Sequence, residues 1–147
     1  MRYTMEQMQD KIQRWMRIAP KELKEVLLKG AKLATKEAQS KHLSGPKMPR
    51  GVGGTTGATL AVQSGRLRRS INENVTVSKD RVVAQIGTNV KYGRIHEYGG
   101  TIKNAFGKGI TVKMPERPFL RPSVKEKKPR IMELILDGFM EAYKKSG

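Results

Sequence analysis

Residues that could carry acid–base or metal chemistry are few in this sequence. The two histidines, His42 and His96, lie far apart, and there is no cysteine among the 147 residues. A zinc site needs three or four converging ligands, and His96-Glu97 lacks the second histidine of a metalloprotease helix. The 13 acidic residues are scattered, without a pair of carboxylates placed for acid–base work. We therefore expect no catalytic residue, no metal, no cofactor and no enzymatic activity, and a structural hydrogen-bonding role for His96.

Glu97 is the acidic residue whose surroundings favour a specific role. Three arginines, Arg94, Arg117 and Arg121, lie near it in the sequence. A carboxylate and a guanidinium form charge-assisted hydrogen bonds, either within the chain or across to a neighbouring subunit. The alternative is an exposed side chain in a surface ion pair, which contributes little to stability. The sequence leaves both open.

The net charge is the strongest feature of the composition. Basic residues outnumber acidic ones by 30 to 13, which gives a formal charge of +17, and the excess is spread along the whole chain. Such a surface repels copies of itself unless a polyanion or an acidic partner is near. We expect contact with DNA or with an acidic protein ring, the alternative being a charge that serves solubility alone. The residues best placed to face DNA are Lys47, Arg50, Arg66, Arg68 and Arg69.

A glycine-, proline- and threonine-rich stretch covers residues 44–63. A loop of about 20 residues is long for a compact domain. Its glycines, between Gly51 and Gly57, lack the Gly-Lys-Ser/Thr ending of a nucleotide-binding loop. We expect a mobile arm that orders against a neighbour or DNA, or else a simple linker. Beyond it, Ser64 can cap a short helix that carries Leu67 and Ile71 inward.

Two helices are expected before this loop. Thr4 and Gln7 form a capping box, which predicts a first, peripheral helix over residues 1–19. Pro20 interrupts the pattern because proline disfavours a helical residue before it, so a second helix is expected over 20–41. The first helix has a methionine-rich face, which either closes over the core or docks on a neighbour: Met5, Met8, Ile12, Trp15 and Met16. The apolar stripe of the second is Leu23, Val26, Leu27, Ala31, Ala34 and Ala38.

Short strands and one short helix make up the middle of the chain. Alternating residues predict antiparallel strands over 74–78 and 81–86. A helix over 92–98 ends at Gly99-Gly100, because glycine adopts the left-handed terminal conformation without a Cβ clash. Two more strands, over 101–103 and 109–114, flank a glycine-bearing turn.

Three prolines then force an extended run before the last helix: Pro115, Pro118 and Pro122. The run presents Phe119 and Leu120, which anchor it either in the domain's own core or across subunits. A helix is expected over 123–145, with Pro129 marking its true first turn and 123–128 irregular. One apolar stripe is Ile131, Leu134, Ile135, Gly138, Phe139 and Ala142, and a second beside it is Met132, Leu136, Met140 and Tyr143. The second stripe needs a partner protein or the N-terminal helix to cover it.

Together these elements predict an α+β fold in a single domain over residues 1–147, with its core in 20–145. A small, mostly antiparallel, twisted sheet of about four strands packs against the helix over 20–41 and the C-terminal helix. No run approaches about 18 apolar residues, so we expect no membrane span. The N-terminus lacks the apolar segment of a signal peptide, and the absence of cysteine suits a protein made in the cytoplasm.

Three blocks in order resemble a known family. They are Ser64-Gly-Arg-Leu-Arg-Arg-Ser-Ile71, then Tyr92-x-x-Ile-His-Glu-Tyr-Gly-Gly100, then Met114-Pro-Glu-Arg-Pro-Phe-Leu-Arg-Pro122. They are similar to the signature of tail-completion proteins of long-tailed bacteriophages, also called head–tail joining, minor tail Z-like or virion-morphogenesis proteins. The resemblance covers roughly residues 20 to 145, which leaves the first helix outside it.

The resemblance implies a structural protein of the virion neck, assembled in the host cytoplasm, that works as a ring of six copies and joins the tail to the DNA-filled head. The implied partners are the tail terminator or tail tube, the head connector and, without sequence preference, the DNA in the channel. The residues expected at subunit or partner interfaces are Tyr92, Ile95, Glu97, Tyr98, Arg117, Phe119, Leu120 and Arg121.

Two alternatives stay open. A free-standing, sequence-independent nucleic-acid-binding protein explains the charge, but it predicts stacking aromatic residues or a recognition helix. The chain has only eight aromatic residues, one Trp, four Tyr and three Phe, and no such motif. The other alternative is a different ring of the same neck, such as the tail terminator.

Overall fold

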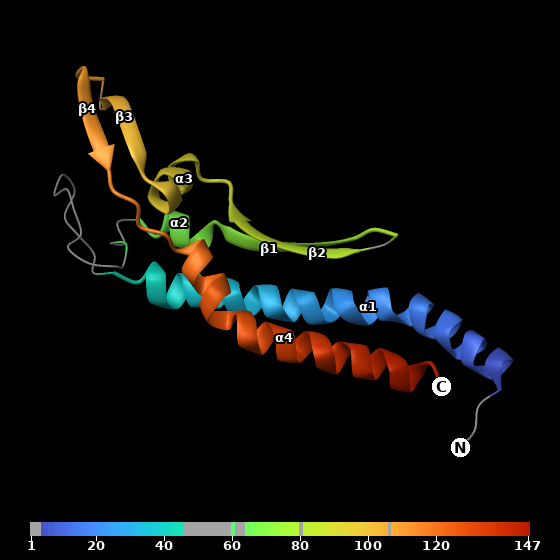
Figure 1. Cartoon of the computed structure of the whole chain (residues 1–147). Helices are drawn as coiled ribbons and strands as arrows, with labels where there is room; N and C mark the ends of the chain where they lie inside the picture. The colour runs from blue at the N-terminus through green and yellow to red at the C-terminus, as the bar shows by residue number, and fades with distance from the viewer. Residues whose placement is uncertain (1–3, 46–59, 61–63, 80, 106) are drawn as a thin grey trace. The chain divides into compact units, whose positions relative to one another are not determined.

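The computed structural model describes residues 4–45, 60, 64–79, 81–105 and 107–147 (Figure 1). The fold class is α+β, as predicted. The elements in order are α1 (Met5–Glu37), a π-helical turn η1 (Ala38–His42), α2 (Arg66–Arg69), β1 (Ile71–Val77), β2 (Val82–Thr88), α3 (Lys91–Tyr98), β3 (Gly100–Ala105), β4 (Ile110–Met114) and α4 (Leu120–Lys145). Most of the predicted loop over 44–63, with Lys47 and Arg50, lies outside the described residues.

The predicted break at Pro20 is wrong, because α1 runs without interruption from Met5 to Glu37. The capping box at its start is confirmed, since the Gln7 side chain accepts a hydrogen bond from the Thr4 backbone N–H at 3.0 Å and the Thr4 hydroxyl accepts one from the Gln7 backbone N–H at 3.3 Å. Figure 1 shows the helix changing direction toward its N-terminal end, as expected of a helix with an internal proline. A proline inside a helix removes a backbone hydrogen bond and lowers stability. Contacts on both sides of Pro20 offset this loss of stability.

Those contacts lie between α1 and α4. The rings of Trp15 and Phe139 stack with centroids 6.0 Å apart on one side of Pro20. On the other, a Cβ at Gly138 would lie 2.7 Å from Val26, so α4 approaches α1 as closely as it does because this residue is glycine. The first predicted stripe of α4 is confirmed, since all six of its residues are buried or half-buried.

Helix α4 starts three residues earlier than predicted, at Leu120, and the expected irregular segment over 123–128 is helical. Pro122 falls in the first turn, where a missing N–H costs no intrahelical bond. Pro129 lies inside the helix, so it does not mark the first turn. Among the described helices none combines the length and apolarity that crossing a membrane requires.

Within the described residues, four strands form two separate two-stranded sheets, β1–β2 and β3–β4, rather than one sheet. In the antiparallel β3–β4 hairpin Gly100 lies opposite Met114 and Ile102 opposite Val112, and an irregularity follows before Ala105 meets Ile110. Strand number and hairpin pairing follow from alternation and turn residues, which act locally. Pairing between hairpins is not local, and here α3 separates β2 from β3 along the chain.

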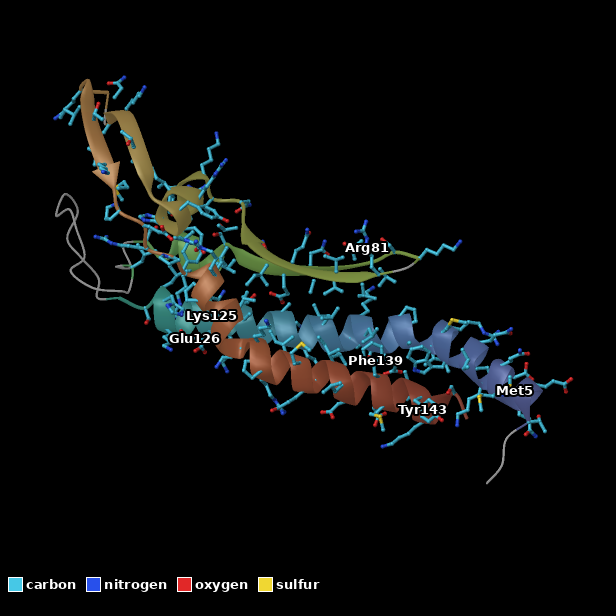
Figure 2. All side chains as sticks on the ribbon, viewed as in Figure 1. Met5, Arg81, Lys125, Glu126, Phe139 and Tyr143 are labelled. Atoms are coloured by element: carbon cyan, nitrogen blue, oxygen red, sulfur yellow. The ribbon has the colours of Figure 1, made fainter. Side chains whose placement is uncertain are left out.

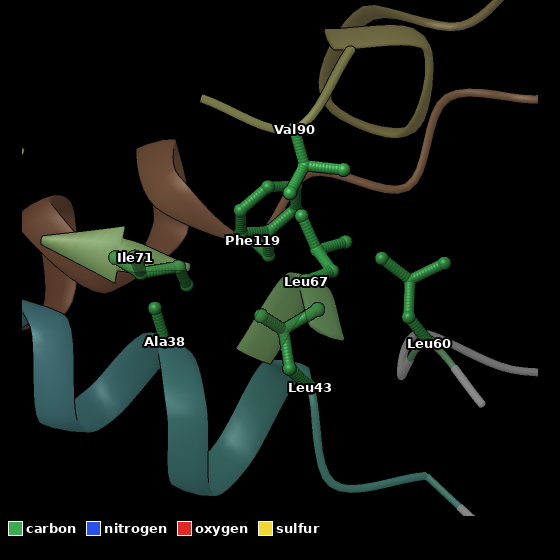
Figure 3. Close-up of a cluster of buried hydrophobic side chains, with 7 residues drawn as sticks. All are labelled: Ala38, Leu43, Leu60, Leu67, Ile71, Val90 and Phe119. Carbon is green, nitrogen blue, oxygen red and sulfur yellow. The ribbon is translucent and has the colours of Figure 1, made fainter. Parts of the chain in front are cut away.

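The chain divides into two compact units. Unit 1 comprises Met1–Lys32, Glu73–Gln85 and Lys127–Gly147, and unit 2 comprises Leu33–Asn72 and Ile86–Glu126. Unit 2 has a small apolar core (Figure 3). Residues of η1, α2 and the start of β1 contribute to it, together with residues of the segments that follow η1 and precede α3 and α4. Its buried members are Ala38, Leu43, Leu60, Leu67, Ile71, Val90 and Phe119. The inward placement of Leu67 and Ile71 is confirmed, although Ile71 opens β1 instead of ending α2.

Candidate functional site

The site is built around the carboxylate of Glu97, on the last turn of α3. Only 3% of this residue is exposed. One carboxylate oxygen accepts hydrogen bonds from the backbone N–H groups of Phe119 and Leu120, at 2.8 and 2.9 Å. The other accepts from the backbone N–H and the Nε–H of Arg121, at 2.9 and 3.2 Å. Glu97 therefore caps the start of α4 from 22 to 24 residues away in the sequence.

This arrangement suits the chemistry of a helix start. The first N–H groups of an α-helix have no partner within the helix, and its N-terminus carries a partial positive charge. No Ser, Thr, Asp or Asn stands near the start of α4, in the run Pro115 to Pro122, to cap it locally. An ionised carboxylate accepts hydrogen bonds from several of these donors at once, and the partial positive charge of the helix N-terminus stabilises it.

The pKa of Glu97 lies below its ordinary value. Burial by itself raises this pKa. The hydrogen bonds from the backbone N–H groups of Leu120, Phe119 and Arg121 and from the Arg121 guanidinium together lower the pKa by more than burial raises it. Hydrogen bonds to a charged form favour that form. The carboxylate is therefore ionised at neutral pH although it is buried.

Arg121 ties together three segments of unit 2. Its guanidinium donates to the Glu97 carboxylate, to the Glu97 backbone oxygen at 2.7 Å and to the carboxylate of Glu116. It also lies over the ring of Tyr98, 5.0 Å from the centroid. Of the three arginines expected near Glu97, Arg121 is the partner observed. The Arg117 backbone N–H instead donates to the His96 oxygen at 2.8 Å.

Two glycines allow the backbone of this site to pack closely. Gly99 ends α3 with φ +67°, and a Cβ there would lie 3.0 Å from the Glu116 nitrogen and 3.1 Å from the Met114 oxygen. Gly93 is buried on α3, and a Cβ there would lie 2.6 Å from Thr88 Cγ2 and 3.2 Å from Leu67. A larger residue at either position would push the proline-rich segment or the core away from α3.

Phe119 and Ser123 continue the site into the core. Phe119 is fully buried in the core of unit 2, which is the first of the two placements predicted for it. Ser123 is fully buried too, and its hydroxyl donates to the Phe119 backbone oxygen one turn back. Leu120 is partly buried against the same cluster. The proline-stiffened run is thus anchored at its C-terminal end by one apolar side chain and one carboxylate.

The eight predicted interface residues separate into three groups by exposure. Glu97 and Phe119 are buried, and their contacts lie within unit 2. Ile95, Arg117 and Leu120 are half-buried. Three are exposed, and of these Arg121 lies over the ring of Tyr98 while Tyr92 contacts His96: Tyr92, Tyr98 and Arg121. Their part in a subunit contact stays a prediction.

His96 plays a smaller part than expected. Its backbone oxygen accepts the Arg117 bond, and its ring meets Tyr92 edge-on with centroids 6.0 Å apart. The buried Nδ1 atom has no hydrogen-bond partner among the described residues, so ring hydrogen bonding through this atom is not observed. Burial, and then the charge of Arg117, lower the pKa of His96, so its ring is neutral at neutral pH.

The predicted basic cluster sits on α2. Arg66, Arg68 and Arg69 are all exposed, and the Arg68 backbone oxygen accepts a hydrogen bond from Gln39 at 3.0 Å. The helix N-cap is Gly65, and Ser64 contributes one bond, from the Arg66 N–H to its hydroxyl at 3.3 Å. Over the described residues no three acidic or histidine side chains converge as a metal ion would require.

The fold and this site define a small, strongly basic α+β protein whose α3–α4 junction is held by a buried carboxylate. The model of the phage virion morphogenesis family matches residues 30–139. The chain therefore belongs to the phage virion morphogenesis family, and the matched segment contains the whole of the Glu97 site. The match begins inside α1, so the first 25 residues of that helix, 5–29, precede it. Comparison with curated proteins and with solved structures gave no match.

Proposed function

We propose that this protein is a structural subunit of the neck of a long-tailed phage. In this role it completes the tail and joins it to the DNA-filled head as a member of an oligomeric ring, without catalysing a reaction. The observation that carries the proposal is the family match over residues 30–139, which includes the Glu97 site. The tail terminator or tube, the head connector and further copies of the chain are its partners.

The geometry of unit 2 supports this role because the Glu97 site holds the backbone of the proline-rich segment in place and presents no reactive groups. Glu97, Arg121 and Phe119 lock the proline-rich segment between α3 and α4. A rigid segment costs little conformational entropy when a partner binds beside it. The exposed Tyr92, Tyr98 and Arg121 are then presented in one fixed arrangement to a neighbouring subunit.

Antibody labelling of purified virions tests the position directly. Label at the junction between head and tail, with the protein present in mature particles, is the expected result. Absence of the protein from mature particles, or label confined to the tail tip or the capsid shell, contradicts the proposal. Label on the tail top of head-free tails, but not on tail-free heads, identifies the tail as the component that carries the ring.

Non-specific DNA contact by α2 is a second part of the proposal, favoured by the net charge of +17 and the three exposed arginines. Lys and Arg side chains bind phosphates without reading bases. A free-standing nucleic-acid-binding protein is the rival function. An electrophoretic shift at roughly 0.15 M salt, where Debye screening is substantial, separates them. Tight, stoichiometric coating of duplex DNA by the isolated protein favours the rival, and weak binding favours the neck protein.

A further inference from the structure

Positive charge is concentrated in unit 2. This unit has 15 basic and 4 acidic residues, a net charge of +11, whereas unit 1 has 15 and 9, a net charge of +6. The four carboxylates of unit 2 are all paired, and they share two cations: Glu97 and Glu116 with Arg121, Glu37 and Glu126 with Lys41. Figure 2 shows Glu126 on α4 close to η1, which carries Lys41. No further carboxylate of this unit is left for its remaining basic side chains.

The β3–β4 hairpin carries three of these remaining basic residues. Between Gly100 and Met114 the only charged residues are Lys103, Lys108 and Lys113, and all three are exposed. None of them forms an ion pair with another residue that the structure describes. The hairpin therefore presents positive charge that is not compensated within it.

The register of the hairpin places the lysines of the two strands on one face. Thr101 lies opposite Lys113, so these side chains point to the same face, and Lys103 joins them because it follows Thr101 by two residues. Thr111 precedes Lys113 by two residues and shares this face for the same reason. Over the regular part of the hairpin the face carries only lysine and threonine side chains, all exposed. The apolar residues of both strands point to the opposite face.

The turn that carries Lys108 is held by its own hydrogen bonds. Asn104 has φ +54°, and its side-chain oxygen accepts a hydrogen bond from the Gly109 N–H at 2.7 Å. The Lys108 N–H donates to the Ala105 oxygen at 3.3 Å. A turn that is already ordered loses little conformational entropy when a ligand binds to it. Lys108 thus extends the lysine and threonine face to the tip, and the whole is called here the hairpin lysine surface.

The composition of the hairpin lysine surface favours DNA over a protein partner. Lysine is depleted at protein–protein interfaces, whereas protein–DNA interfaces are strongly positive. Lysine ammonium and threonine hydroxyl groups both donate hydrogen bonds to phosphate oxygens. A second copy of the hairpin would bring lysines against lysines, and like charges across an interface repel. A two-stranded β-ribbon is also narrow enough to enter the major groove of duplex DNA.

We propose that the β3–β4 hairpin binds the phosphate backbone of duplex DNA through the hairpin lysine surface, without reading the base sequence. This contact is separate from the one proposed for α2, and its lysines are not among the DNA-facing residues expected from the sequence. The inference rests on the proposed function, which brings the chain next to the DNA of the channel. Contacts to phosphates alone let DNA slide along a protein, as a neck through which DNA passes requires.

The salt dependence of DNA binding tests this contact. Binding of the full-length protein to a fluorescent duplex is measured by anisotropy at several salt concentrations, and the slope of log affinity against log salt is compared among variants. One variant replaces Lys103, Lys108 and Lys113 with Gln. Each phosphate that loses its lysine reduces the slope by about 0.9, so the slope falls by as much as about 2.7. Replacing the same three residues with Arg keeps the charge, and the slope of the wild type is expected.

A matched control removes the same charge from unit 1. Lys21, Lys24 and Lys29 are exposed on α1, and Gln is about as good a helix former as Lys. Replacing these three with Gln gives a net charge of +14, as in the hairpin variant. A loss of slope that is confined to the hairpin variant shows that position, and not net charge, determines the effect.

This test and the test of the proposed function can fail independently. Labelled particles report whether the protein occupies the neck, whatever part of it touches DNA. The slope reports the hairpin contact in solution, whatever the particle contains. Circular dichroism of each variant confirms that these exposed substitutions leave the fold intact.

Three outcomes overturn the proposal. Absence of measurable DNA binding by the wild type at low salt is the first. An unchanged slope for the hairpin variant is the second, and if that variant also yields fewer infectious particles, the lysines face an acidic protein instead. Equal losses of slope in the hairpin and α1 variants are the third, because DNA then responds to the net charge of the protein and not to the hairpin.

Discussion

Replacing Glu97 tests whether one buried carboxylate holds the start of α4. Glu97→Ala leaves the backbone N–H groups of Phe119, Leu120 and Arg121 without their acceptor. A buried donor without a partner costs about 1–3 kcal/mol. The Phe119 donor is buried and those of Leu120 and Arg121 are partly buried, so we expect a loss of about 3 kcal/mol in the free energy of unfolding, against a total of about 5–15 kcal/mol for a typical domain.

Glu97→Gln separates the charge from the shape. The amide oxygen can still accept from Phe119 and Leu120, but the amide NH2 then faces the two N–H donors of Arg121. We expect a loss of about 1–3 kcal/mol, smaller than that for alanine. Glu116→Gln is the matched control, because Glu116 contacts the same guanidinium but is half exposed, and such a pair contributes less than about 1 kcal/mol.

Urea unfolding followed by far-UV circular dichroism gives these free energies. Trp15 belongs to unit 1 and Glu97 to unit 2, so Trp15 fluorescence reports on the other unit and serves as a second signal. The predicted order of unfolding free energies is wild type and Glu116→Gln highest, Glu97→Gln lower, and Glu97→Ala lowest. Equal midpoints for Glu97→Gln and Glu116→Gln would refute the capping role.

The remaining predictions concern the same junction and its surroundings. Because folding lowers the pKa of Glu97, the ionised carboxylate stabilises the folded state fully above the unfolded pKa, and this stabilisation is lost as the pH falls through the lower folded pKa. The wild type should therefore lose more stability below about pH 4.5 than Glu97→Gln does. Parallel pH profiles of the two proteins would argue against this. Gly93→Ala should cost about 1–3 kcal/mol by overpacking, whereas Gly87→Ala, with no atom within 4 Å of the added Cβ, should be nearly neutral in the same urea experiment. Phe119→Ala should cost about 3–5 kcal/mol and reduce the yield of infectious particles, and a normal plating titre would contradict it. Changing Arg66, Arg68 and Arg69 to Gln should reduce the slope of log affinity for duplex DNA against log salt by about 0.9 for each phosphate that is no longer neutralised, and an unchanged slope excludes α2 from DNA binding.

Local signals predicted most of the elements. The capping box at Thr4, the Gly99 terminator and the alternation in the hairpins each depend on neighbouring residues, and the structure has all three, although β1 begins at Ile71, three residues before the predicted start at 74. The inward direction of Leu67 and the first stripe of α4 follow from helical spacing, which is equally local.

Errors arose where distant contacts outweigh local preferences. Pro20 and Pro129 both lie inside helices, where a proline costs about 3 kcal/mol. At Pro20 the contacts between α1 and α4 on both sides of the proline offset this cost. The arginine partner of Glu97 was among those predicted, but the helix cap was not. The available signal was the absence of a local capping residue at the start of α4, which requires an acceptor from elsewhere in the chain. Which strands join into one sheet is decided by tertiary packing, and alternation carries no information about it.

We propose that this protein joins the phage tail to the head, and a lysate made without the protein is the decisive test of that role. Negative-stain micrographs of a phage lacking the gene should show DNA-filled heads and finished tails lying separate, with attachment restored by the wild-type protein supplied from a plasmid. Intact, infectious virions in the absence of the protein would contradict the account.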